Sequence, residues 1–243
     1  MCIRDSMHGD HSLGIPSIIQ TYSLNRRIEP LEIYGPKGIE EWILWSIQIL
    51  KFIPSYPLII RKVKEGTILE AREYSIKAAR VHHSTETYAY SLEEKERPGR
   101  FNPEKARELG VPIRLWKLLQ MGKEVKFGGK VVRPREVLSP PRRGRKIVIS
   151  GDTRPCEALI KLAKGADVLV HEATYTEDKK ELAEETLHST AKEAAEIAKE
   201  AGVKLLVLIH FSARYQDPKP LLKEAREVFP ETIGAYEGLA LEV

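Results

Sequence analysis

The sequence has no apolar run long enough to cross a membrane. Its longest apolar stretches, such as residues 205–209, have the length of a strand, whereas a membrane-spanning helix needs about 20 apolar residues. Only two cysteines are present, Cys2 and Cys156, which argues against a disulfide framework. The N-terminus also lacks the apolar core of a signal peptide. These absences exclude a membrane-spanning protein and lead us to expect a cytoplasmic one.

The chain also lacks a strong excess of charge of one sign. Its 39 Lys and Arg and 35 Asp and Glu give a formal net charge of +4, which by itself does not indicate a nucleic-acid partner. With 243 residues, 42% of them hydrophobic, the chain is large enough for one sizeable core. We therefore expect one compact domain, and we find no internal repeat.

Short apolar runs alternate with helical patterns, which is typical of layered α/β folds. Strands are expected at residues 31–34, 146–150, 167–170 and 204–209, with further extended segments at 58–63 and 67–81. Helices are expected at residues 39–50, 156–164, 189–201 and 218–228. The sequence therefore predicts a sheet covered by helices.

Residues 91–126 interrupt this alternation. They begin with a strongly charged stretch and continue through Pro103, Gly110 and Pro112 into a basic amphipathic segment, as an inserted arm would. A second basic patch, at residues 133–146, is interleaved with Pro and Gly. Each is either a solvated loop or a surface for phosphates.

Six of the seven histidines fall in short polar motifs or at the ends of predicted strands. Potential metal ligands crowd into the motif His8-Gly9-Asp10-His11, and imidazoles with a carboxylate suit zinc. Further polar side chains follow the strands of the second half, namely Asp152, His171, Glu172 and His210. Neighbouring strands that end at one edge would bring these side chains together.

His188 precedes a predicted helix start. Thr190 and Glu193 have the spacing of a capping box, which would fix His188 at a helix N-terminus. His188 either decorates this cap or donates a proton or hydrogen bond to a phosphate oxygen.

Five motifs occur in order along the chain: His8-Gly9-Asp10-His11, Ser150-Gly151-Asp152-Thr153-Arg154-Pro155, His171-Glu172-Ala173-Thr174, His188-Ser189-Thr190 and His210-Phe211-Ser212-Ala213-Arg214-Tyr215. This set resembles the ribonuclease Z family, the zinc-dependent tRNA 3′-processing endonucleases of the metallo-β-lactamase superfamily. The resemblance runs from Met7 to the C-terminus. It implies an α/β fold, the four-layer αββα sandwich of the metallo-β-lactamases.

The resemblance also implies two zinc ions per subunit, held in two sites that share Asp152. The first site would comprise His8, His83 and Asp152, and the second Asp10, His11, Asp152 and His210. The choice between His82 and His83 is open. The distance from His83 to Tyr90 matches the family motif and favours His83.

The implied activity removes the 3′ trailer of precursor tRNA through attack of a metal-activated water on the phosphodiester, leaving a 3′ hydroxyl. Asp10 is the candidate base and His188 the candidate proton donor, while Glu172 either orients His188 or supports the strand end. Alternatives are another phosphodiesterase of the same superfamily and a tRNA-binding fragment without catalysis.

The arm at residues 91–126 stands where the family carries a tRNA-gripping insertion, and the family is homodimeric. Precursor tRNA and a second copy of the chain are therefore the implied partners. The implied substrate-binding residues are Arg100, Lys105, Arg107, Arg114, Lys117 and Arg214.

The first motif departs from the family pattern His-x-His-x-Asp-His, because Ser6 stands where the first histidine belongs. Residues 1–6 are also unlike the family's N-terminal strands. We therefore expect a truncated sandwich that lacks these strands and binds fewer than two zinc ions.

Overall fold

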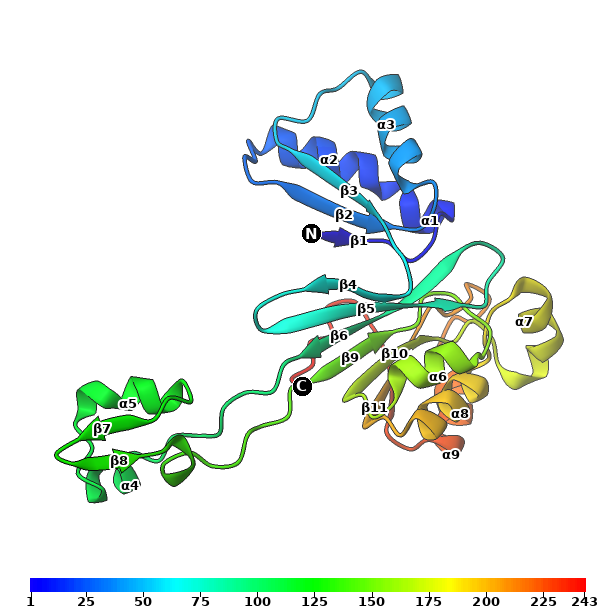
Figure 1. The fold of residues 1–243 in the computed structure, drawn as a ribbon. Helices are drawn as coiled ribbons and strands as arrows, with labels where there is room; N and C mark the ends of the chain where they lie inside the picture. The colour runs from blue at the N-terminus through cyan, green and yellow to red at the C-terminus, as the bar shows by residue number, and fades with distance from the viewer. The chain divides into compact units, whose positions relative to one another are not determined.

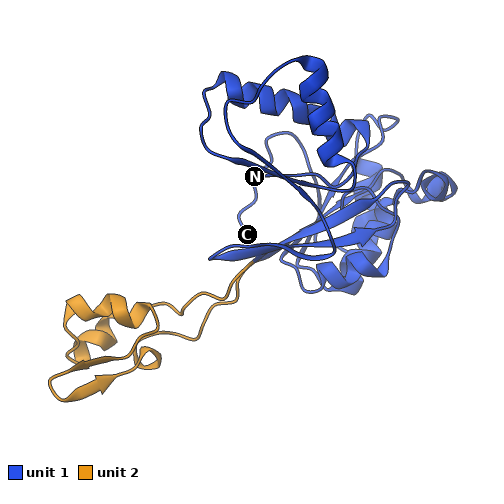
Figure 2. Ribbon diagram, turned by 45° about the horizontal axis from the view of Figure 1, so that its top comes forward, with its two compact units in different colours: residues 1–93, 146–243 blue, residues 94–145 orange.

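The chain leaves the larger of two structural units at Glu93 and returns to it at Lys146 (Figure 2). The structure is a computed structural model that describes residues 1–243. The larger unit comprises Met1–Glu93 and Lys146–Val243, and the smaller unit Glu94–Arg145. None of the helices combines the length and apolar composition needed to cross a membrane.

The N-terminal part of the larger unit is a three-stranded parallel sheet with helices packed on it (Figure 1). Its elements are β1 (Cys2–Ile3), α1 (Gly9–Ser12), α2 (Gly14–Leu24), β2 (Leu31–Gly35), α3 (Ile39–Leu50) and β3 (Leu58–Lys62). A Cβ atom on Gly35 would lie 2.8 Å from Cγ1 of Ile39, so glycine is what allows α3 to start so close to β2. The helix expected at residues 39–50 is confirmed at those bounds.

The segment before the first histidine motif takes part in this sheet. Cys2 and Ile3 pair in parallel with Ile33 and Tyr34 of β2, and the Asp5 carbonyl accepts a hydrogen bond from the Tyr88 amide. The start that looked unrelated in sequence therefore forms an edge strand and places the residues that follow it.

The second sheet has seven strands in the order β12-β11-β10-β9-β6-β5-β4. They are β4 (Gly66–Glu70), β5 (Tyr74–Val81), β6 (Thr87–Glu94), β9 (Lys146–Ile149), β10 (Val168–Glu172), β11 (Leu205–Ile209) and β12 (Thr232–Gly234). The strands from β9 to β12 are parallel, and β6 is antiparallel to β9. Val170 is in register with both Ile149 and Val207, so the carboxyl ends of β9, β10 and β11 meet at one edge.

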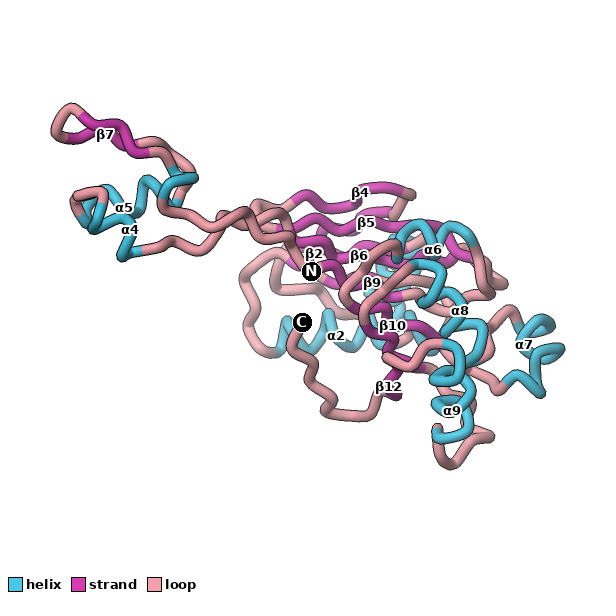
Figure 3. The backbone as a smooth tube through the Cα atoms, turned by 90° about the horizontal axis from the view of Figure 1, so that it is seen from below, coloured by secondary structure: helices cyan, strands magenta, loops and turns pink.

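Helices cover one face of this sheet (Figures 1 and 3). They are α6 (Glu157–Ala163), α8 (Ala191–Ala201) and α9 (Lys219–Val228), while η2 (Glu177–Lys179) and α7 (Lys180–Thr186) lie between β10 and α8 in sequence. The buried face of α8 is largely alanine, which permits close approach to the sheet. The predicted capping box is confirmed, because Thr190 and Glu193 bond each other's backbone amides at 3.1 and 2.9 Å.

Three hydrophobic clusters define the layers of the larger unit. One lies between α2, α3 and the first sheet and includes Ile19 and Ile43. The second joins the two sheets through Tyr34 and Tyr88, and the third fills the space under α6, α8 and α9 around Leu169. The order helix, sheet, sheet, helix is the αββα arrangement that the resemblance implied.

The smaller unit has its own core and is larger than the arm expected at residues 91–126. It contains α4 (Pro103–Glu108), α5 (Ile113–Gln120), the hairpin of β7 (Val125–Phe127) and β8 (Lys130–Val132), and η1 (Pro134–Glu136). Residues 91–93 belong to β6 instead. The second basic patch up to Arg145 belongs to this unit, because Val132 and Val137 pack in the same core as Ala106.

Leu169 tests the core beneath the helices. It is completely buried in β10, so Leu169→Ala should lower the free energy of unfolding by about 2–5 kcal/mol through reduced burial and a cavity. Leu92→Ala on exposed β6 surface is the matched control and should cost less than about 1 kcal/mol. Urea unfolding followed by circular dichroism measures both, and equal losses would contradict the placement of this core.

Candidate metal centre

Imidazoles and carboxylates from distant parts of the larger unit converge at the carboxyl edge of the second sheet. Asp152 follows β9, His210 follows β11, and His83 follows β5. The first histidine motif comes from the segment between β1 and α2, and His188 precedes α8. The register of the parallel strands therefore places the site, as expected for an open α/β sheet.

The side chains form three overlapping groups. Within each group the potential ligand atoms lie within 4.8 Å of one another. The groups are His8, His83 and Asp152; Asp10, His11 and His210; and Asp152, His188 and His210. The structure thus brings together all six residues named from the sequence as ligands, and Asp152 occurs in two of the groups.

The histidines are held so that one ring nitrogen of each faces the others. Nδ1 of His83 donates to the Leu187 carbonyl at 2.8 Å, which leaves the lone pair on Nε2. Nδ1 of His210 lies 2.8 Å from Oγ1 of Thr174. Because the Thr174 hydroxyl donates its proton to Glu172, it accepts from His210, and Nε2 of His210 is likewise free.

Two of these ring nitrogens approach each other closely. Nε2 of His83 lies 3.3 Å from Nδ1 of His8, while the other nitrogen of His8 lies 3.1 Å from Oγ of Ser84. Burial is the main cause that lowers the pKa of His83, which favours the neutral imidazole. Neutral imidazole is the form that binds metals, and outer partners of this kind are typical of metal-bound histidines. The donor set therefore fits a divalent metal such as zinc.

His82 and His83, between which the sequence left the choice of ligand open, differ in burial and in their distance from the cluster. His82 is exposed and belongs to none of the groups, whereas His83 is half-buried among them. The backbone of His82 pairs with Arg154 in an isolated bridge. The geometry therefore favours His83.

Asp5 is a site residue that sequence reasoning missed. Nδ1 of His11 lies 2.9 Å from each carboxylate oxygen of Asp5, and Nε2 lies 3.3 Å from Asp152. Hydrogen bonds with Asp152 and Asp5 raise the pKa of His11 to about 10. No spacing in the sequence signals this contact, because it depends on where β1 ends.

Ser6 is fully buried, and its hydroxyl accepts a hydrogen bond of 3.3 Å from the His8 amide. It belongs to none of the groups. The group around His8 and His83 therefore has three ligands, without the imidazole that the family pattern places at position 6.

Glu172 orients His188 from behind. One of its carboxylate oxygens lies 2.9 Å from Nδ1 of His188 and accepts the Thr153 amide at 2.8 Å. Burial alone would lower the pKa of His188, but the hydrogen bond and charge of Glu172 raise it overall. Glu172 is completely buried, so its contact with the exposed part of the site runs through the His188 ring.

His171 does not join the cluster, and the expectation that it would is wrong. Successive side chains of a strand point to opposite faces, so Glu172 of β10 faces the site while its neighbour faces the helices. His171 is completely buried, with Nδ1 bonded to the Glu172 carbonyl at 2.6 Å.

Asp10 is exposed at the rim of the cluster, with one carboxylate oxygen 3.6 Å from Nε2 of His11. Arg214 is also exposed, and its guanidinium lies 5.2 Å from the centre of the Tyr175 ring. Both side chains are thus accessible to a ligand from the larger unit's own surface.

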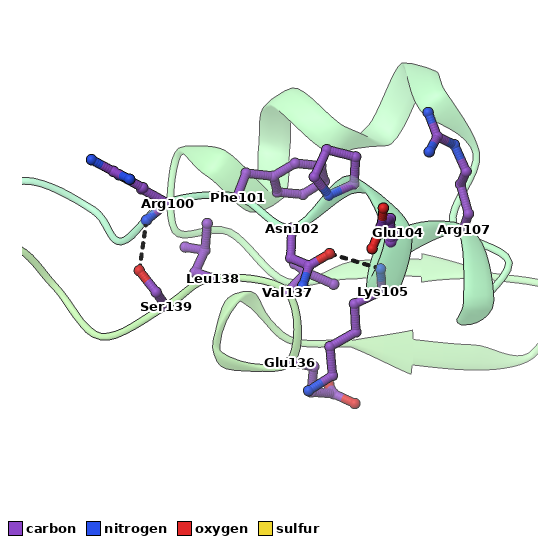
Figure 4. Close-up of a pocket in the computed structure, with 11 residues that line it drawn as sticks. Arg100, Phe101, Asn102, Glu104, Lys105, Arg107, Glu136, Val137, Leu138 and Ser139 are labelled. Atoms are coloured by element: carbon purple, nitrogen blue, oxygen red, sulfur yellow. Dashed lines mark hydrogen bonds between the residues drawn. The ribbon is translucent and has the colours of Figure 1, made fainter.

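The predicted cations of the arm lie on the smaller unit. Arg100, Lys105 and Arg107 line a pocket of about 660 Å³, and Figure 4 shows how its lining side chains lie. Arg114 and Lys117 lie on exposed positions of α5, outside this pocket. The lining cations stand beside Glu104 and Glu136, so this pocket has mixed charge.

Comparison with known proteins gives relatives across almost the whole chain. A family model described as a Beta-lactamase superfamily domain matches residues 137–211. Ribonuclease Z of Nitrosopumilus maritimus is 45% identical over 98% of this chain and 80% of its own length. Ribonuclease Z of Methanosarcina acetivorans is 47% identical over 97% of this chain and 78% of its own length.

Solved structures show the same fold at lower identity. The short form of human tRNase Z superposes with a TM-score of 0.67 at 24% identity, covering 99% of this chain and 77% of that one. The metallo-β-lactamase fold protein YhfI of Bacillus subtilis gives a TM-score of 0.65 at 20% identity, covering 98% and 74%. The expected metallo-β-lactamase fold is therefore confirmed.

The adjacent histidines offer a matched test of the centre. His83→Ala removes a ring nitrogen that faces the cluster and should lower the zinc retained per chain after dialysis, whereas His82→Ala should leave it unchanged. Inductively coupled plasma mass spectrometry measures both. Equal zinc loss in the two variants, or loss in His82→Ala alone, would contradict the assignment of His83.

Proposed function

The chain belongs to the ribonuclease Z family, and from this premise we propose that it is an endoribonuclease that removes the 3′ trailer of precursor tRNA and leaves a 3′ hydroxyl. The observation that supports this proposal most directly is the ligand cluster around Asp152 with His188 beside it. That arrangement supports hydrolysis of a phosphodiester at a metal centre with His188 as the proton donor.

We propose zinc as the metal, held by two sets of residues that share Asp152. The first set is His8, His83 and Asp152, and the second is Asp10, His11, Asp152 and His210. Bound by these residues, zinc would supply Lewis acidity toward the phosphate and its attacking water. Because Ser6 cannot replace an imidazole, the first set should hold its ion more weakly.

His188 is suited to deliver a proton to the leaving 3′ oxygen. Its Nδ1 is tied to Glu172, so the other ring nitrogen remains to face the substrate, and its raised pKa favours the protonated ring. Asp10, whose carboxylate is exposed beside His11, is our candidate for accepting the proton of the attacking water. The proposed acid and base are thus two different residues.

The smaller unit is proposed to bind tRNA phosphates. Residues 94–145 carry 15 Lys and Arg against 6 Glu, a net charge of +9, although the whole chain has only +4. The remainder of the chain is therefore acidic overall. Concentrating cations on one unit favours sequence-independent contact with a phosphate backbone, through Arg100, Lys105, Arg107, Arg114 and Lys117. In the larger unit, Arg214 is proposed to contact the substrate near the metals.

We also propose that the protein is a homodimer. α3 exposes apolar side chains along one face, including Trp45 at 65% and Ile49 at 60% exposure. Contiguous apolar surface of this kind commonly marks a protein interface, and a second copy of the chain is the partner that the family implies.

His188→Ala separates proton donation from metal binding. The variant should retain its zinc but cleave precursor tRNA about 10²–10⁴-fold more slowly, which is the usual cost of losing a general acid. Single-turnover cleavage and zinc content are measured on the same preparation. If zinc is lost together with His188, this residue is a ligand and its proposed role is wrong.

Arg114→Gln combined with Lys117→Gln tests phosphate binding by α5. The affinity for precursor tRNA should fall, and the dependence of log Kd on log salt should become shallower by roughly one for each phosphate that the variant no longer neutralises. Hydrolysis of a small chromogenic phosphodiester should change little. The control is Glu104→Gln combined with Glu108→Gln, which removes two negative charges from the same unit instead of two positive ones. An unchanged salt dependence in the α5 variant would exclude α5 from the tRNA interface.

A further inference from the structure

Arg154 links the loop that carries Asp152 to the loop that carries His188. Its Nη1 donates to the His188 carbonyl at 2.6 Å and to Glu193 at 2.7 Å. Its Nη2 donates to the other carboxylate oxygen of Glu193 at 2.6 Å. One guanidinium therefore contacts both the backbone of His188 and the first turn of α8.

This ion pair is largely withdrawn from water. The side chain of Arg154 is 12% exposed and that of Glu193 is 7% exposed. Burial alone would raise the pKa of Glu193, but hydrogen bonds from Arg154 and from the Thr190 amide lower it overall. Replacing such a buried pair by apolar residues is often neutral or stabilising, so the burial of this pair is no evidence that its role is to stabilise the fold.

Further hydrogen bonds join the same two loops. The Ser189 hydroxyl donates to the Thr153 carbonyl, and the Thr153 amide donates to the Glu172 oxygen that also holds His188. The His188 ring is thus fixed by Glu172, while its backbone is fixed by Arg154. Both restraints connect His188 to the segment that carries Asp152, one through Arg154 itself and the other through the bond from the Thr153 amide to Glu172.

We propose that Arg154 and Glu193 form a clamp that positions His188 relative to Asp152 for proton transfer. The inference rests on the proposed role of His188 as proton donor and names two positioning residues for it. Arg154 is not itself a catalytic residue, because both terminal nitrogens of its guanidinium are bonded within the protein. A proton donor that moves by about 1 Å can lose on the order of 10²-fold in rate.

Four variants test the clamp: Arg154→Met, Glu193→Met, the double variant, and Arg154→Lys. Each single Met variant removes the nearest partner of a largely buried charge, leaving Glu184 at 3.8 Å from Arg154 or Lys180 at 3.7 Å from Glu193, and should lower the melting temperature. The double variant should recover much of this loss, apart from the part that comes from the lost bond between Glu193 and the Thr190 amide. In all three, kcat for precursor tRNA should fall about 10–100-fold while KM and zinc content stay near wild type. Arg154→Lys keeps the charge without the planar fork and should recover part of kcat.

Two results would overturn the clamp. Recovery of kcat together with the melting temperature in the double variant would mean that the pair is purely structural. A rise in KM with kcat unchanged in Arg154→Met would mean that Arg154 contacts the substrate instead.

A readout without turnover separates this proposal from the proposed function. In ¹⁵N-histidine spectra, the Nδ1 signal of His188, assigned with His188→Ala, reports the hydrogen bond to Glu172. It should be sharp in the wild type and broadened or shifted in the Met variants, including the double. A wild type that fails to cleave precursor tRNA yet shows this change would contradict the function and retain the clamp. An unchanged signal in the double variant would refute the clamp.

Discussion

The site depends on how each imidazole is tied from outside. His11, His83 and His210 bond through Nδ1 to Asp5, the Leu187 carbonyl and Thr174, so Nε2 of each faces Asp152 or its neighbours. Without these outer bonds the imidazole rings could rotate, and their Nε2 atoms would not point toward one shared metal-binding position. The sheet register sets where the candidate ligand residues lie, and the outer hydrogen-bond partners set which ring nitrogen faces the cluster.

Our proposal assigns the chemistry and the phosphate contacts to different units of the chain. The larger unit has the ligand cluster and His188, while the smaller unit has most of the excess positive charge. Because these cations are concentrated on one unit, the whole-chain charge of +4 does not reveal the +9 of residues 94–145. Contacts with phosphates contribute affinity that does not depend on the nucleotide sequence. The proposed metal ligands and His188 would act only at the phosphodiester bond that is cleaved.

Local signals predicted much of this structure. The apolar period of residues 39–50 and the Thr190–Glu193 cap were readable because they depend on neighbours in sequence. The five ordered motifs led to the candidate metal ligands. Sequence could not reveal that Asp5 holds His11 or that Arg154 holds the His188 backbone, because those contacts join segments that only the fold brings together. The sequence-based expectation for His171 was also wrong, because side chains alternate along β10 and His171 lies on the face opposite to Glu172.

We propose that Asp152 is shared by two sets of metal ligands. Anomalous diffraction at the zinc edge, from crystals of the full chain grown with zinc, tests it most directly. We predict a strong peak among Asp10, His11, Asp152 and His210, and a weaker one among His8, His83 and Asp152, since Ser6 leaves that set short of an imidazole. Zinc bound away from Asp152 would contradict its sharing between the two sets, and two peaks of equal strength with Ser6 as a ligand would contradict the weaker first set.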